Sequence, residues 1–109
     1  MGFPPRVRRQ VQARSEGTCE GCGQAAASDM HHRKFRSRGG RDTVENALHL
    51  CGMGGVAGCH GRAHTEAAAT DEGWSLNSWD SVARPVLYRG GWVVLTADGG
   101  VEPISEPPF

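Results

Sequence analysis

The fold is decided by residues 19–64, whose sequence is CEGCGQAAASDMHHRKFRSRGGRDTVENALHLCGMGGVAGCHGRAH. This stretch contains all the cysteines and histidines of the 109-residue chain: Cys19, Cys22, Cys51, Cys59, His31, His32, His49, His60 and His64. Large aliphatic residues are scarce, because the whole chain has nine Val, five Leu and one Ile. We therefore expect one domain over residues 1–109, held together by a cross-link such as a metal site.

The cysteines form two pairs that suit a structural zinc ion. Cys19 and Cys22 are spaced C-x-x-C, a turn that presents two thiolates to one tetrahedral ion. Seven residues separate Cys51 from Cys59, where two to four are usual, but four of the seven are glycine, so the loop can fold back. We predict one zinc ion on the four cysteines. Unliganded buried thiols and a disulfide are the alternatives, and the same loop lacks the lysine of a phosphate-binding loop.

Two classes of protein are excluded by the absence of long apolar segments. No stretch approaches the ~18 consecutive apolar residues of a membrane span. Residues 1–17, MGFPPRVRRQVQARSEG, carry charge but lack the apolar centre of a secretion signal. We expect a cytoplasmic protein with no membrane partner, whose cysteines bind metal because the cytoplasm is reducing.

The order of apolar and turn-forming residues predicts an α+β fold. We expect a basic N-terminal helix in 1–17, a core over 18–73 and an antiparallel β-meander over 74–104, followed by a frayed tail at 105–109. Within the core we expect short strands that begin at residue 29 and span 46–51, and a helix of about three turns over 60–73.

The histidines have a spacing that suits metal-assisted hydrolysis. His60 and His64 are four residues apart, so on a helix they share one face and can address one ion. His31 and His32 are adjacent on a strand and point in different directions, so one can bind metal while the other addresses a water. Hydrolysis of a phosphodiester needs such a metal and a neutral imidazole that accepts a proton. Asn46, on the neighbouring strand, can orient that imidazole.

This order of residues resembles the HNH endonucleases of the ββα-metal, zinc-knuckle type. The resemblance covers roughly residues 14–70 and rests on C-x-x-C, His31-His32, Asn46, Cys59-His60 and His64. The glycine-rich segment 51–60 is similar to that of small HNH proteins encoded by tailed phages of actinobacteria.

The resemblance implies a ββα-metal core and a divalent-metal-dependent DNA endonuclease that nicks or cuts both strands. In that family pattern His32 is the general base, and Asn46 orients it and holds the two strands together. His31, His60 and His64 bind one catalytic divalent ion (Mg²⁺, Mn²⁺, Ni²⁺ or Zn²⁺).

A basic loop follows the two histidines and predicts contacts to DNA phosphates. Its cations are Arg33, Lys34, Arg36, Arg38 and Arg41. Such contacts give affinity that is independent of sequence and falls with salt. Within the loop we expect Phe35 to lie in the core, and we expect the same of Trp79 and Trp92.

The formal net charge of zero conceals two halves of opposite sign. Residues 1–64 hold ten Lys and Arg against five Asp and Glu, and residues 65–109 hold two against seven. The basic half suits double-stranded DNA. If the protein is phage-encoded, the resemblance implies DNA packaging with terminase and portal proteins in the host cytoplasm, and restriction or homing is also open. The alternative function is a catalytically silent zinc-knuckle module that binds DNA or assists packaging.

Overall fold

The computed structural model describes residues 2–105, which form a mixed fold of short helices and two small antiparallel sheets. The helices are α1 (Pro5–Ser15), α2 (Gly58–Thr65) and α3 (Ala68–Asp71), and the strands are β1 (Asp29–His32), β2 (Ala47–Leu50), β3 (Val86–Tyr88), β4 (Gly91–Leu95) and β5 (Val101–Pro103). The α+β class is confirmed at this level. The frayed tail was expected at 105–109, and all of it except Ser105 lies outside the described residues.

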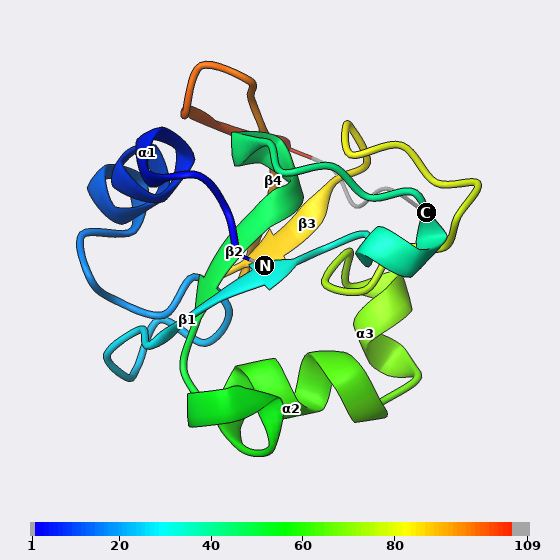
Figure 1. Ribbon diagram of the computed structural model, residues 1–109, viewed down its shortest axis with the longest axis horizontal. Helices are drawn as coiled ribbons and strands as arrows, with labels where there is room; N and C mark the ends of the chain where they lie inside the picture. The colour runs from blue at the N-terminus through cyan, green and yellow to red at the C-terminus, as the bar shows by residue number, and fades with distance from the viewer. Residues whose placement is uncertain (1, 106–109) are drawn as a thin grey trace.

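The first sheet pairs β1 with β2 and places the histidine pair. In its antiparallel register His31 lies opposite Leu48 and His32 opposite Ala47. All four residues of β2 are buried, because other elements of the fold cover this strand and exclude water from it. Figure 1 shows β1 and β2 near the centre of the fold, with α1 on one side and α2 on the other.

The helix expected over 60–73 is divided into α2 and α3, so the prediction of one continuous helix is wrong. Glu66 has extended backbone angles (φ −99°, ψ 130°) and ends α2. The Thr65 hydroxyl donates to the carbonyl of Gly61 at 3.0 Å, a contact by which threonine competes with helix continuation. The break allows Ala69 to pack in the core, and Trp74 follows α3 into the same core.

The predicted C-terminal meander is confirmed, with strand order β3-β4-β5. Its first turn is centred on Arg89 and Gly90, which both have positive φ (51° and 85°), as a two-residue hairpin of type I′ requires. Arg89 holds this conformation through its guanidinium, which donates to the carbonyls of Ser15, Thr18 and Cys19 at 2.7, 2.8 and 3.1 Å. The turn therefore ties the meander to the first cysteine pair.

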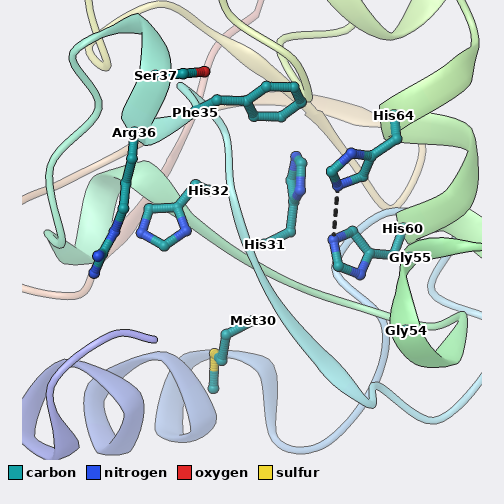
Figure 2. A pocket seen from close by; sticks show the side chains of 10 residues that line it. All are labelled: Met30, His31, His32, Phe35, Arg36, Ser37, Gly54, Gly55, His60 and His64. Atoms are coloured by element: carbon teal, nitrogen blue, oxygen red, sulfur yellow. Dashed lines mark hydrogen bonds between the residues drawn. The ribbon is translucent and has the colours of Figure 1, made fainter. Parts of the chain in front are cut away.

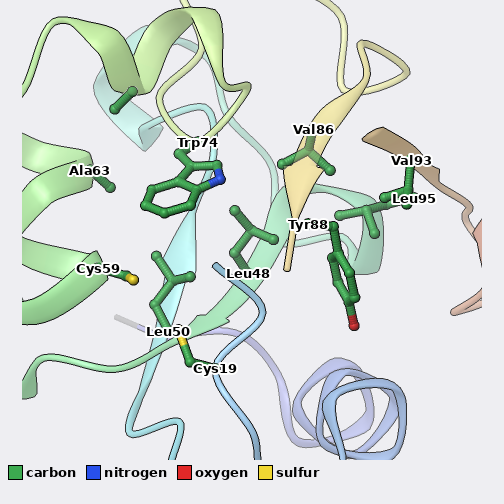
Figure 3. Packing of buried hydrophobic residues seen from close by; sticks show 11 residues of the cluster. Cys19, Leu48, Leu50, Cys59, Ala63, Trp74, Val86, Tyr88, Val93 and Leu95 are labelled. Atoms are coloured by element: carbon green, nitrogen blue, oxygen red, sulfur yellow. The ribbon is translucent and has the colours of Figure 1, made fainter. Parts of the chain in front are cut away.

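The main apolar core joins the meander to β2 and α2. Leu48, Leu50 and Trp74 lie at its centre, between α2 and the β3–β4 hairpin (Figure 3). A second cluster packs Phe3, Val7 and Val11 against Val44 and Ala47.

Two of the tryptophans expected in the core lie elsewhere. Trp79 is 81% exposed. Trp92 is only partly buried, because it alternates along β4 with Val93, whose side chain faces the core.

A buried carboxylate connects the N-terminal helix, the cysteine turn and the meander. Glu20 is fully buried, and Arg14 donates to both of its oxygens, at 2.7 Å from Nε and 2.9 Å from Nη2. The Tyr88 hydroxyl donates to Glu20 Oε2, and the His49 backbone N–H donates to Oε1, each at 2.8 Å. Burial and the charge of Glu20 raise the pKa of Tyr88. Glu20 therefore joins α1, β2 and β3 at one buried point.

Candidate functional site

The four cysteines converge as predicted. Their sulfur atoms all lie within 4.8 Å of one another. The long segment between Cys51 and Cys59 folds back because Gly52 adopts a φ of 102° and touches the Ala57 carbonyl, where a Cβ would lie 1.7 Å from the oxygen. Any other residue at this position would push the two cysteines apart.

The surroundings of these sulfur atoms fit a zinc ion. Backbone N–H groups of Gly21 and Cys51 donate to Cys19 Sγ at 3.3 Å, and that of Cys59 donates to Cys51 Sγ at 3.4 Å. The N–H of Gln24 donates to Cys22 Sγ and lowers the pKa of that thiol to about 7, while burial raises the pKa of Cys59. A bound dication deprotonates its thiol ligands despite such burial. The cluster can therefore hold one zinc ion tetrahedrally.

Three histidines form a second group of potential metal ligands. His31 comes from β1, and His60 and His64 come from successive turns of α2, so that their nitrogen atoms lie within 4.8 Å of one another. The Nε2 atoms of His60 and His64 are 3.1 Å apart. Figure 2 shows the three rings gathered on one side of a pocket. Two imidazole nitrogens that face each other so closely must share either a proton or a cation.

Hydrogen bonds fix the tautomers of two of these rings. His60 Nδ1 lies 2.7 Å from Asp29 Oδ2, and His31 Nε2 lies 2.6 Å from the Trp74 carbonyl oxygen. A carbonyl can only accept, so His31 carries its proton on Nε2, and its lone pair is on Nδ1. Burial lowers the pKa of His31 to about 3 and also lowers the pKa of His64, and both shifts favour the neutral ring that a metal ligand requires.

His32 lines the same pocket, whose volume is about 550 Å³, from the other side of β1. Its Nε2 lies 2.8 Å from Asp42 Oδ1, and Arg36 binds the other oxygen of that carboxylate at 2.6 Å. The ring of Phe3 stacks on His32 with a centroid distance of 3.9 Å. These contacts hold the imidazole in one orientation, with Nε2 protonated and the Nδ1 lone pair free to accept a proton.

Asn46 does not orient His32 directly, which corrects one part of its expected role. Its side-chain oxygen accepts from the Lys34 N–H at 2.8 Å, and its amide donates to the carbonyls of Lys34 and Arg41. Within residues 2–105 no hydrogen bond joins Asn46 to His32. Asn46 instead closes the loop that leads to Asp42.

Arg33 is not a phosphate contact, so the prediction made for it is wrong. Its side chain is fully buried and donates to the carbonyls of Gly73, Glu45, Val82 and Arg84 at 2.8 to 2.9 Å. Arg33 directly follows β1, and its side chain lies in the interior, as does that of His31 two residues before it.

The rest of the basic loop faces water to different degrees. Arg36, Arg38 and Arg41 are exposed, and Lys34 is partly buried. Phe35 stacks on His64 with a centroid distance of 5.0 Å and lines the pocket, so its expected place in the core is wrong. Arg38 packs over the outer side of this ring, 4.6 Å from its centroid. Of the five predicted cations, three are therefore exposed, and one of these, Arg36, is paired with Asp42.

The acidic partners of the histidines were missed from the sequence. Asp29 precedes His31 by two residues on β1, and this spacing places both side chains on one face of the strand. The spacing of Asp29 and His31 in the sequence therefore indicated that this carboxylate lies near the histidine site. Asp42 lies ten residues from His32 in sequence, and only the fold of the intervening loop brings them together.

Comparison with known proteins leaves the site to be interpreted from its geometry. Within residues 2–105 no helix is long and apolar enough to span a membrane. The chain matches no family model, no curated protein and no solved structure.

Proposed function

We propose that this protein is a divalent-metal-dependent endonuclease that hydrolyses phosphodiester bonds in DNA. The observation that carries the proposal is the placement of His32, held by Asp42, on the pocket into which His31, His60 and His64 converge. We further propose that β1, β2 and α2 correspond to the ββα-metal unit of HNH endonucleases, on the strength of the sequence resemblance.

The three converging histidines would hold the divalent ion. When bound, such an ion neutralises charge on the phosphate and stabilises the leaving oxygen. Asp29 keeps the proton of His60 on Nδ1, so Nε2 offers its lone pair to the ion. Among residues 2–105 three protein ligands converge here, so a bound ion would have further positions for the phosphate.

His32 would act as the general base. Its free Nδ1 takes the proton of the attacking water while the water oxygen bonds to phosphorus and the bond from phosphorus to the leaving ester oxygen breaks. Asp42 accepts the hydrogen bond from Nε2 and stabilises the imidazolium that forms. Arg36, bound to Asp42, keeps that carboxylate ionised and in place.

The exposed cations beside the pocket would bind the DNA backbone. Arg36, Arg38 and Arg41 lie on the loop that borders His32, and contacts from them to phosphates would give affinity without base recognition. The phage resemblance extends the proposal to the nicking or cutting of concatemeric DNA during packaging, beside terminase and portal proteins in the host cytoplasm. This extension rests on the sequence alone.

Plasmid nicking tests the proposal. The zinc-loaded chain is incubated with supercoiled DNA and Mg²⁺, Mn²⁺ or Ni²⁺, and we expect His32→Ala to reduce the cleavage rate at least about 100-fold. His49→Gln is the matched control, because His49 binds Ser15 Oγ at 2.8 Å and does not line the pocket. Equal cleavage by the His32→Ala variant, or none by the wild type, contradicts the proposal. DNA binding without cleavage would favour the silent zinc-knuckle module.

A further inference from the structure

Trp79 is held in an exposed position by a well-ordered turn. Tryptophan is highly buried on average, yet the side chain of Trp79 is 81% exposed. The turn around it is fixed by Asp80, which accepts from the Asn77 N–H at 2.8 Å and from Arg84 at 3.2 Å. The indole is therefore presented to solvent by a structured segment rather than by a loose end.

The segment that carries Trp79 runs along the basic loop. Leu76 pairs with Lys34 in a parallel bridge, and its N–H donates to the Arg33 carbonyl at 2.7 Å. Lys34 Nζ approaches the carbonyl of Ser78, the residue before Trp79, at 3.4 Å. A cavity of about 340 Å³ between Lys34, Arg41 and Ser81 continues this surface. Lys34 is therefore the cation of the loop that contacts the segment next to Trp79, and Glu45 also lines the cavity.

A chain of contacts links this surface to the histidine pocket. Phe35 stacks on His64, Arg38 covers Phe35, and Arg38 Nη1 donates to the Leu76 carbonyl at 3.1 Å. Leu76 and Trp79 are three residues apart, so their Cα atoms are separated by at most about 11 Å. Trp79 is therefore connected to the histidine pocket through Leu76, Arg38 and Phe35.

We propose that Trp79 stacks on an unpaired base of the DNA substrate, in the strand that flanks the phosphate bound in the histidine pocket. The proposal rests on the nuclease function proposed above and specifies its substrate: DNA with a single-stranded segment, as in a flap, gap or junction. Aromatic side chains flanked by cations bind single strands in this way, because every unpaired base offers a free ring face. Bases within an intact duplex are already stacked and offer none. Lys34, whose Nζ donates to the carbonyl before Trp79, favours a polyanion over an apolar protein partner.

Fluorescence anisotropy with a labelled oligodeoxythymidine of about 12 nucleotides tests this contact. The zinc-loaded chain carries His32→Ala in every sample, so that the probe is not cleaved. We expect Trp79→Ala and Trp79→Leu to raise the Kd about 5- to 100-fold, and Trp79→Phe to raise it less than about threefold. The control Val56→Ala removes another exposed apolar side chain and is expected to leave the Kd unchanged. The Kd for a blunt duplex should change less than about twofold with any of these substitutions of Trp79.

Each outcome bears on one of the two proposals. The stacking contact is overturned by any of three results: an unchanged Kd in Trp79→Ala, wild-type affinity in Trp79→Leu, or a loss of affinity for the duplex as large as that for the oligonucleotide. Wild-type affinity in Trp79→Leu in particular would indicate an apolar surface for a protein partner. A wild type that cleaves no DNA but binds the oligonucleotide through Trp79 overturns the nuclease function and leaves the contact standing. Because Trp79 is exposed, unchanged circular dichroism and zinc content will show that its variants are folded.

Discussion

His32 Nε2 and Asp42 Oδ1 lie 2.8 Å apart, and this contact determines which nitrogen of the proposed base is free to accept a proton. Replacing Asp42 with Asn removes the charge that stabilises the imidazolium and allows the wrong tautomer. We expect Asp42→Asn to lower the cleavage rate at least about tenfold, since such replacements beside a catalytic histidine cost up to ~10⁴-fold.

The measurement for Asp42 compares single-turnover cleavage with DNA affinity. The rate should fall while the Kd for uncleaved DNA changes little. Asp71→Asn, which alters an exposed carboxylate on α3, is the matched control. A parallel loss of affinity and rate would show instead that Asp42 only supports the shape of the loop.

Zinc removal is expected to unfold the protein. The cysteine cluster joins the turn at Cys19 and Cys22 to β2 and α2, and the apolar core around it is small. We expect about one zinc ion per chain after dialysis, retained in the wild type and lost in Cys51→Ser. Loss of the thermal transition on adding a strong chelator would confirm the structural role. A wild type without tightly held zinc would contradict it.

Arg33 is expected to be essential for stability rather than for DNA binding. Arg33→Lys cannot reproduce the contacts of a planar guanidinium with four carbonyl groups, and it leaves several of those groups buried and unpaired. We expect the free energy of unfolding in urea to fall by about 3 kcal/mol. Arg41→Lys, on the exposed part of the loop, should leave it unchanged. A stable Arg33→Lys variant with weakened DNA affinity would restore the original prediction for this residue.

Tyr88 is expected to make stability decline in alkali. Its pKa is raised in the folded state by burial and by the charge of Glu20, so its contribution is complete below the unfolded pKa of about 10 and is lost as the pH rises above that value. Tyr88 is the only tyrosine of the chain, so phenolate absorbance reports on it alone. We expect this absorbance to appear above about pH 10 together with unfolding. Ionisation of Tyr88 while the protein stays folded would contradict the prediction.

The sequence predicted the elements whose residues carry a strong local signal. The cysteine pairs, the helix face shared by His60 and His64, and the glycine turns of the meander all depend on spacing, which the folded chain preserves. Arg33 was misread because its charge suggested a surface position. Four backbone carbonyls left free by loops distant in sequence made a buried position favourable.

The remaining differences also arise from tertiary contacts. No proline or glycine in the sequence marks the break between α2 and α3. The break follows from the contact of the Thr65 hydroxyl with the Gly61 carbonyl and from the packing of Ala69. The exposure of Trp79 could not be read from composition, because a chain poor in Leu and Ile is expected to bury its tryptophans. Asp42 was missed because its partner depends on the path of a whole loop.

Cys59 and His60 are neighbours in the first turn of α2, and one faces the cysteine cluster while the other faces the histidine pocket. A helix of eight residues is too short to persist alone in water. Its first turn therefore depends on the thiolate anchor, and the imidazole beside that anchor is positioned only afterwards. If zinc binds the four cysteines, we therefore expect an order of assembly in which zinc is loaded first, and in which a chain without zinc has no ordered pocket for a second ion.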